Sequence, residues 1–123
     1  MRKNLISVPE FDELPAPVYF RYAEIDAHSH ACPHRHAWGS LDYVAHGVMR
    51  FEVEGQRFMS PPQYALWIPP NTEHSAYNAQ AIVYRSVYLD AAHCQHLRPR
   101  PVTLAISDIL KAILSDFARR DVN

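Results

Sequence analysis

Short alternating runs separated by turn residues restrict the fold of this chain more than any other feature of its sequence. The runs are rich in β-branched and aromatic residues and are short, so each of them predicts a strand. Two runs within 48–60 flank Glu54-Gly55, an acidic–glycine pair of the kind that tight hairpins use. The other expected strands lie at 18–25, 41–47, 64–70, 73–80, 81–90 and the end of 98–106. This succession predicts an all-β fold, either an antiparallel sandwich or a barrel.

The period of the apolar residues changes near the C-terminus, which indicates one amphipathic helix. Ser107 is a suitable cap for this helix, and Asp108 falls in its first turn, where an acidic side chain is favourable. The apolar face of the helix consists of Ile109, Leu110, Ile113, Leu114 and Phe117. Such a face either closes the core of its own domain or pairs two subunits, and the sequence leaves both alternatives open.

The 123 residues fit one domain, with an N-terminal arm at 1–17, a β-barrel at 18–106 and a C-terminal helix at 107–123. A formal net charge of −1 gives no indication that this segment binds nucleic acid directly. Cys32 and Cys94 lie far apart in the sequence, so free thiols and a cytoplasmic location are expected. The sequence contains no apolar run of the roughly 18 residues that span a bilayer, and no signal peptide is expected.

Histidine is the unusual component of the sequence, because four of the eight fall within nine residues. On a strand, His34 and His36 would share one face and direct both imidazoles to one spot, as a metal ion requires. A third ligand must come from elsewhere, and His74 is the best candidate because it follows a proline-ended strand after a short turn. We expect His28 and His30, in the preceding stretch HSHACP, to lie on a solvated lead-in loop.

Two motifs in the sequence resemble those of the cupins, small double-stranded β-barrels. The first motif, H-x-H followed by Glu and Gly, corresponds to His34, His36, Ser40 and Gly47. The second, P-x-G-x-x-H-x-x-x-N, corresponds to Pro69, Asn71, His74 and Asn78. Asn71 replaces a glycine, and asparagine is the residue that best tolerates the positive φ expected there. Ser40 replaces the Glu ligand of metal cupins, and Asp42 lies two residues further along the same strand face.

A narrower resemblance covers residues 28–90, which are similar to the N-terminal sensor domain of AraC/XylS-type transcription regulators. The matching segments are H-x-H-x-W-G, G-V-M, E-G followed by P-P, W-I-P-P and R-S-x-Y-L. The resemblance implies a cupin double-stranded β-barrel, that is, an antiparallel jelly-roll, with a C-terminal amphipathic helix. It also implies a small-molecule effector, a homodimer, and DNA binding only through a C-terminal helix-turn-helix domain that is absent from this sequence.

Three interpretations of His34, His36 and His74 remain open at this point: a Zn²⁺, Ni²⁺ or Fe²⁺ site, a polar floor for an effector, or a structural role only. Other residues of the barrel are candidates for contact with the ligand: Trp38, Ser40, Asp42, Trp67, Tyr84 and Arg85. The two tryptophans are equally suited to filling the core. Arg85 is either an interior partner for an acid such as Asp42 or an outward-facing surface charge.

The sequence therefore favours a ligand-sensing and dimerisation domain of an AraC-type regulator, with an effector or a divalent metal, or both, in the barrel. The alternative is a stand-alone metal-dependent cupin enzyme, such as a dioxygenase or isomerase, built on the same histidines. The serine at position 40 and the lack of a convincing general acid or base argue against the enzyme, so no catalytic residue is assigned. A plain dimerisation module with an empty barrel is the third possibility.

Overall fold

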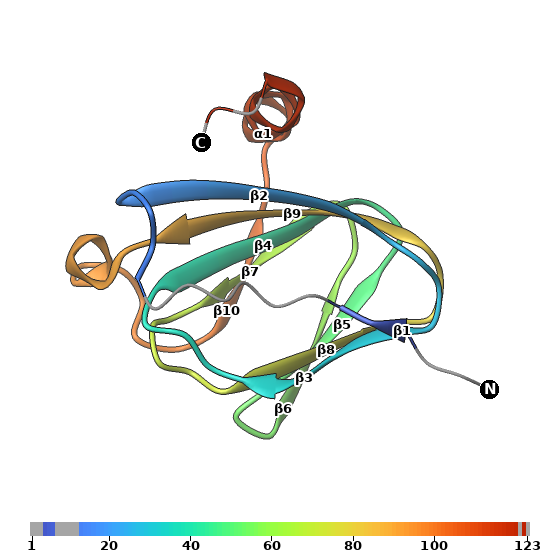
Figure 1. Ribbon diagram of the computed structural model, residues 1–123, viewed down its shortest axis with the longest axis horizontal. Coiled ribbons are helices and arrows are strands. Elements are labelled where there is room, and N and C mark those ends of the chain that lie inside the picture. The colour runs from blue at the N-terminus through green and yellow to red at the C-terminus, as the bar shows by residue number, and fades with distance from the viewer. Residues whose placement is uncertain (1–3, 7–12, 121, 123) are drawn as a thin grey trace.

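The computed structural model describes residues 4–6, 13–120 and 122, and in it two five-stranded sheets pack face to face as a jelly-roll (Figure 1). The first sheet has the order β1-β3-β8-β5-β6, and the second has the order β10-β7-β4-β9-β2. The sheets are not joined into a continuous closed barrel. The cupin-like, antiparallel all-β fold expected from the sequence is therefore confirmed as a jelly-roll with one C-terminal helix.

The first sheet consists of β1 (Asn4–Leu5), β3 (Ser29–His34), β8 (His74–Asn78), β5 (Met49–Val53) and β6 (Gln56–Ser60). The second consists of β10 (Val102–Ala105), β7 (Tyr64–Ile68), β4 (Gly39–His46), β9 (Ile82–Leu89) and β2 (Val18–Ile25). The β1–β3 pair is parallel and the other pairs are antiparallel. A short 3-10 helix, η1 (Ala91–Cys94), follows β9.

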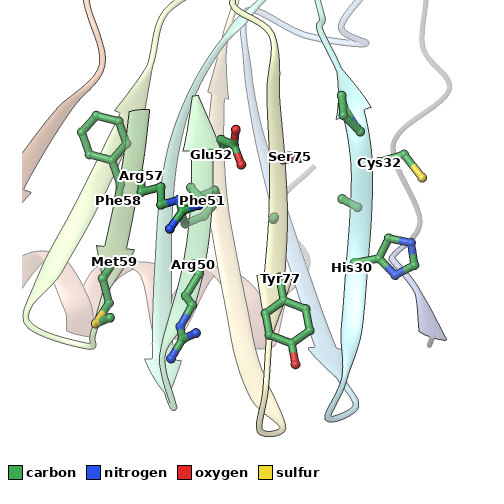
Figure 2. Close-up of a pocket in the computed structure, with 13 residues that line it drawn as sticks. His30, Cys32, Arg50, Phe51, Glu52, Arg57, Phe58, Met59, Ser75 and Tyr77 are labelled. Atoms are coloured by element: carbon green, nitrogen blue, oxygen red, sulfur yellow. The ribbon is translucent and has the colours of Figure 1, made fainter. Parts of the chain in front are cut away.

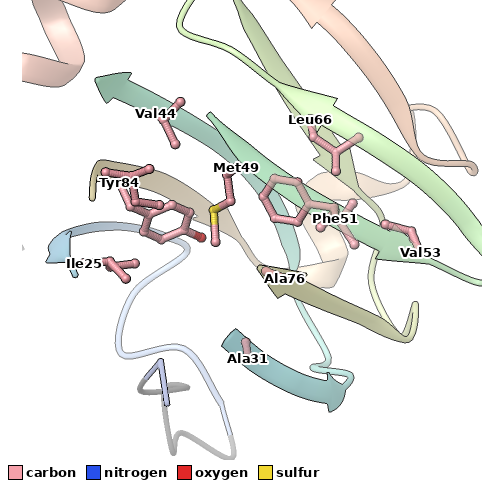
Figure 3. Close-up of a cluster of buried hydrophobic side chains, with 11 residues drawn as sticks. Ile25, Ala31, Val44, Met49, Phe51, Val53, Leu66, Ala76 and Tyr84 are labelled. Atoms are coloured by element: carbon pink, nitrogen blue, oxygen red, sulfur yellow. The ribbon is translucent and has the colours of Figure 1, made fainter. Parts of the chain in front are cut away.

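The main hydrophobic core lies between the two sheets, because successive side chains of each strand point to opposite faces (Figure 3). In β9, for example, Ile82, Tyr84, Ser86 and Tyr88 are buried, and the residues between them are only partly buried. The inward apolar side chains of both sheets form a single cluster: Ile25, Ala31, Val44, Met49, Phe51, Val53, Leu66, Ile68, Ala76, Ile82 and Tyr84. This cluster surrounds one polar region, which is the candidate site described below.

The turns confirm two predictions made from the sequence. Glu54 and Gly55 both have positive φ, 48° and 82°, as the tight hairpin between β5 and β6 requires. Asn71, which replaces a motif glycine, has φ of 58°. Its backbone N–H donates to the carbonyl of His36 at 2.8 Å, so this turn is attached to the segment that carries a candidate ligand.

The stretch HSHACP is not the loop that we expected from its polar composition, because residues 29–34 form strand β3. Ser29 and Ala31 are buried against the interior, and the strand pairs with β8 on one side and β1 on the other. The register shifts between Ala31 and His34. This irregularity accommodates Pro33, which has no N–H to donate to a regular ladder.

Helix α1 (Asp108–Arg120) begins as predicted, since the backbone N–H of Leu110 donates to the Ser107 hydroxyl at 3.1 Å. Leu114 is buried in a second cluster on the outer face of the second sheet, and the Phe117 ring contacts Phe20 edge-on at 4.9 Å. The remaining apolar side chains of the predicted face are exposed: Ile109, Leu110 and Ile113. One edge of the apolar face thus closes the core of its own domain, and the other edge carries the prediction of dimerisation, which stays a prediction.

This division of the helix predicts unequal effects of two alanine substitutions. Leu114→Ala should lower the free energy of unfolding by about 2–3 kcal/mol, because it leaves a cavity between helix and sheet. Ile109→Ala, at a side chain that is 75% exposed, should change stability by less than about 0.5 kcal/mol. Urea unfolding followed by circular dichroism measures both values. Equal losses would contradict the observed docking of the helix.

Candidate functional site

Three histidines from separate parts of the sequence converge between the two sheets. His34 ends β3, His74 begins β8 directly opposite it, and His36 lies in the connection to β4. The ring centroids are 4.3 Å apart for His34 and His74, 5.0 Å for His36 and His74, and 5.8 Å for His34 and His36. One ring nitrogen of each lies within 4.8 Å of the others. The prediction that these residues meet is therefore confirmed.

The reason that we gave for their convergence is only partly right. His34 and His36 do not occupy one strand, because β3 ends at His34 and the chain continues as an irregular segment. The backbone of this segment turns His36 inward, where its ring stacks on the indole of Trp38 at 4.6 Å with an interplanar angle of 4°. The two-residue spacing identified the correct pair of histidines. A turn, and not the alternation of a strand, brings their side chains together.

A shared hydrogen-bond pattern fixes the tautomer of all three rings. Each Nδ1 lies next to a backbone carbonyl two residues away: Cys32 for His34 (2.7 Å), Trp38 for His36 (3.0 Å) and Thr72 for His74 (2.9 Å). A carbonyl oxygen only accepts hydrogen bonds, so each neutral imidazole carries its proton on Nδ1. The Nε2 lone pair of each ring is then free to bind an electrophile.

The interior also keeps two of these rings uncharged. Burial, together with the neighbouring His74, lowers the pKa of His36 to about 4. Burial likewise lowers the pKa of His74. Both imidazoles are therefore neutral at pH 7, which is the form that coordinates metal ions.

A carboxyl group faces the histidines from the second sheet. Asp42 of β4 is 2% exposed, and its Oδ1 accepts hydrogen bonds from Ser40 (2.5 Å), Ser86 (2.6 Å) and Tyr84 (2.7 Å). Ser40, at the position of the usual cupin Glu, thus supports an acid two residues further along the strand. As expected, Ser40, Asp42 and Tyr84 line the same cavity as the three histidines.

Two tyrosines and an arginine complete this wall. Burial, followed by the nearby Asp42, raises the pKa of Tyr84 well above 10, so its hydroxyl remains protonated and donates. Burial also raises the pKa of Tyr88, whose hydroxyl accepts a hydrogen bond from Arg21 at 3.1 Å. Sequence reasoning did not assign Arg21 or Ser86 to the site, and it left Tyr88 open between lining a pocket and filling the core. The alternation of 82–89 groups Ser86 and Tyr88 with Tyr84, and β2 then brings Arg21 opposite Ser86.

The cavity enclosed by these side chains is small, with a volume of about 30 Å³. That volume exceeds the roughly 10–15 Å³ that one water molecule needs, and it is far below the roughly 300 Å³ of a typical organic-ligand pocket. Ile6 of the N-terminal arm also lines it, and its backbone N–H donates to the carbonyl of His30 at 2.8 Å. The arm therefore contributes to closing the cavity.

Two of the predicted ligand-contacting residues, Trp67 and Arg85, face outward, and Trp38 does not line this cavity either. Trp67 lies on the outer face of its sheet, where its Nε1 donates to the carbonyl of Arg98 at 2.8 Å, because the alternation of β7 turns Leu66 and Ile68 inward. Arg85 also faces outward, with its guanidinium 5.7 Å from the centre of the Tyr22 ring. The interior alternative for Arg85 was wrong. Trp38, in contrast, is 2% exposed and packs behind His36 at the edge of the site.

Comparison with known proteins identifies the family. The family model of the AraC-like ligand binding domain matches residues 16–117. The chain belongs to this family. Over 42 residues, this AraC-like domain is 48% identical to the HTH-type transcriptional regulator NimR of Escherichia coli, an alignment that covers 34% of this chain and 15% of NimR.

Solved structures show the same fold for this AraC-like domain at low sequence identity. ToxT of Vibrio cholerae, bound to (E)-4-(8-methylnaphthalen-1-yl)but-3-enoic acid, has a TM-score of 0.66 and 6% identity, over 88% of this chain and 49% of ToxT. An RmlC-like cupin of Shewanella frigidimarina has a TM-score of 0.57 and 17% identity, over 61% and 68% of the two chains. The chain thus spans about half the length of ToxT. In the described part of the chain, no helix is long and apolar enough to cross a membrane.

The buried imidazoles predict a loss of stability in mild acid. The unfolded chain binds protons on these rings near the ordinary pKa of 6.5, whereas folded His36 does so only near 4. Lowering the pH through this interval therefore favours the unfolded state, and the free energy of unfolding should fall. Urea unfolding in the presence of a chelator, at several pH values between 7 and 4.5, measures this slope.

His36→Asn is the matched variant, since its amide can still donate to the carbonyl of Trp38. This variant should lose stability less steeply with acid than the original chain. His46→Asn, at an exposed residue near the end of β4, controls for removal of a histidine from the surface. A slope that is unchanged in His36→Asn would contradict the prediction, because it would show that folding does not lower the pKa of His36.

Proposed function

We propose that this chain is the ligand-sensing domain of an AraC-type transcription regulator and that it binds a divalent transition metal through His34, His36 and His74. The observation that carries the proposal is the common tautomer of the three rings, each with Nδ1 directed to a carbonyl and Nε2 left free. Three neutral imidazoles form a donor set typical of Zn²⁺, and they also suit Ni²⁺ and Fe²⁺.

The remaining walls of the cavity also suit a cation. The carboxyl group of Asp42 supplies the acid that this family of folds usually places at position 40, and three hydroxyl groups hold it in position. When bound, the metal would supply a positive charge that this carboxyl group compensates. A cavity of about 30 Å³ leaves room for an ion and its small ligand but not for an organic effector of ordinary size.

Sensing requires that the ligand bind two states of the domain with different affinities. The proposed ligands come from the end of β3, the connection to β4, and the start of β8, so an ion would tie the β3–β4 connection to β8 through three side chains. The N-terminal arm, which pairs with β3 and places Ile6 over the cavity, is the segment whose position we expect to depend on occupancy. Arm residues 7–12 lie outside the described part.

The rest of the regulator is inferred from the family. NimR is named as a helix-turn-helix transcriptional regulator. We propose that in the present protein, too, DNA is bound by a separate domain of the intact regulator. The alternative of a metal-dependent cupin enzyme has weaker support, because the cavity offers a substrate little space beyond the ion. We therefore favour a sensor over an enzyme.

Metal binding is tested by thermal unfolding of untagged protein after treatment with a chelator. Zn²⁺ at about 100 times its Kd should add about 2.7 kcal/mol to the free energy of unfolding, and Ni²⁺ and Fe²⁺ are tested in parallel. His34→Ala should abolish this gain, because it removes one of the three proposed ligands. Since His34 is only partly buried, its removal should disturb the core little. His96→Ala, at an exposed histidine after η1, is the control and should keep it.

Asp42→Asn tests the contribution of the acid to metal binding separately from that of the histidines, because the amide retains an oxygen acceptor at nearly the same volume. We expect metal affinity to fall by about 10–100-fold in this variant. A chain that gains no stability from any of the three ions would overturn the metal proposal. A gain that survives in His34→Ala would show that the ions bind elsewhere.

We also propose that the regulator forms a homodimer through the exposed edge of α1. Ile109, Leu110 and Ile113 leave an apolar strip uncovered by the described part of the chain. Replacing Ile109 and Ile113 together with Glu should convert a dimer to a monomer in sedimentation velocity experiments. Lys111→Glu, about 200° around the helix from Ile109, is the charge control. A monomeric original chain would contradict this interface.

A further inference from the structure

A large groove lies outside the jelly-roll, on the outer face of the first sheet. It has a volume of about 840 Å³ and is lined by side chains of β3, β8, β5 and β6 (Figure 2). Helix α1 packs over the other sheet and leaves this face uncovered (Figure 1). The volume falls in the range of about 300–1,000 Å³ found for small-molecule sites, whereas the internal cavity does not.

Strand register arranges the outward side chains of this face in two rows. One row, running from β3 to β6, consists of His30, Tyr77, Arg50 and Met59. The next row, running from β8 to β6, consists of Ser75, Glu52 and Arg57. Figure 2 shows the side chains of Arg50, Tyr77 and Met59 together along one part of the face. Tyr77 and Arg50 are therefore direct cross-strand partners on neighbouring strands.

The two arginines give this face an excess of positive charge. Arg50 and Arg57 come from adjacent strands, and neither is in an ion pair with another residue of the described chain. Glu52 is the one acidic residue among the groove's lining side chains, so the charged residues there sum to +1, although the chain as a whole has a formal charge of −1. A single guanidinium group binds a carboxylate through two parallel hydrogen bonds, so each of these arginines is suited to an organic anion.

The same groove offers flat and apolar contacts beside these charges. Tyr77 presents its ring between His30 and Arg50, and the Met59 side chain is 57% exposed next to Arg50. Aromatic and thioether groups favour contact with planar ring systems. We propose that this groove binds a small aromatic carboxylate, with its carboxylate between Arg50 and Arg57 and its ring against Tyr77.

This second site is independent of the metal proposal but touches the same strand. In β8, Ser75 and Tyr77 face the groove, whereas His74 and Ala76 face the interior. A ligand in the groove and an ion in the cavity would therefore contact opposite faces of one five-residue strand. The chain would then bind an organic anion on its surface and a metal ion in its interior.

The probe for this site is 2-naphthoate, titrated into the chain by isothermal calorimetry and by two-dimensional NMR in the presence of a chelator. Chemical shifts should change at residues of β5, β6 and β8. Replacing Arg50 and Arg57 together with Gln should weaken binding by about tenfold or more, since two exposed ion pairs are lost. Glu52→Gln should strengthen binding by about two- to fivefold, because it removes the carboxylate that repels the ligand.

Two further controls separate this site from the others. The neutral 2-naphthamide should bind more weakly than 2-naphthoate, and His34→Ala should leave naphthoate affinity unchanged. The proposal is overturned if naphthoate does not bind, if binding is indifferent to the arginine substitutions, or if it is lost in His34→Ala. A change in sedimentation of the doubly substituted chain without naphthoate binding would also overturn it, because the face would then contact a second copy.

Discussion

A carboxyl group held between two β-sheets is the interaction on which the interior of this molecule depends. An isolated polar group in such a place is costly, and an unpaired charge is more so. Here Asp42 receives three hydroxyl hydrogen bonds on one oxygen, all from side chains of β4 and β9. These strands are neighbours in the middle of the second sheet, so the network also joins the two strands through their side chains. The surrounding apolar cluster is packed around a carboxyl group that already has its hydrogen-bond donors.

The first sheet provides the opposite half of the same region with complementary chemistry. The three imidazoles, two from this sheet and His36 from the connection between β3 and β4, use Nδ1 for backbone carbonyls. They direct no proton from Nε2 into the cavity, since each neutral ring has only one N–H. Lone pairs on one side and a carboxyl group on the other make the space favourable for a cation. The pKa of His36 is low because burial beside another histidine disfavours the positive charge that protonation would add there. The proposed metal ion would differ from a proton in that all three rings would share it.

Sequence patterns predicted the parts of this structure that depend on neighbouring residues. Alternation located nearly every strand, the Glu54-Gly55 pair located the hairpin, and motif spacing brought together three histidines that are separated by up to 40 positions. Alternation alone does not say which of two faces is inside, and this is why Trp67 and Arg85 were placed wrongly among the interior candidates. Strand β3 was missed because its backbone pairing, not its composition, holds it in the sheet. Arg21 was missed because its position depends on pairing with β9 across 65 residues of sequence.

The separation of a small polar cavity from a large outer groove follows from the way that the jelly-roll is filled. Phe51, Met49 and Leu66 occupy the space between the sheets that a larger cavity would need, so the interior retains only about 30 Å³. An organic ligand of ordinary size must then bind outside or displace this core, and close packing makes displacement expensive. Alternate side chains of β8 line the cavity and the groove. A shift of this strand caused by a ligand on one side would therefore also move the side chains that face the other side. The two proposed ligands would therefore be coupled through one strand, provided that each of them binds one position of β8 better than another.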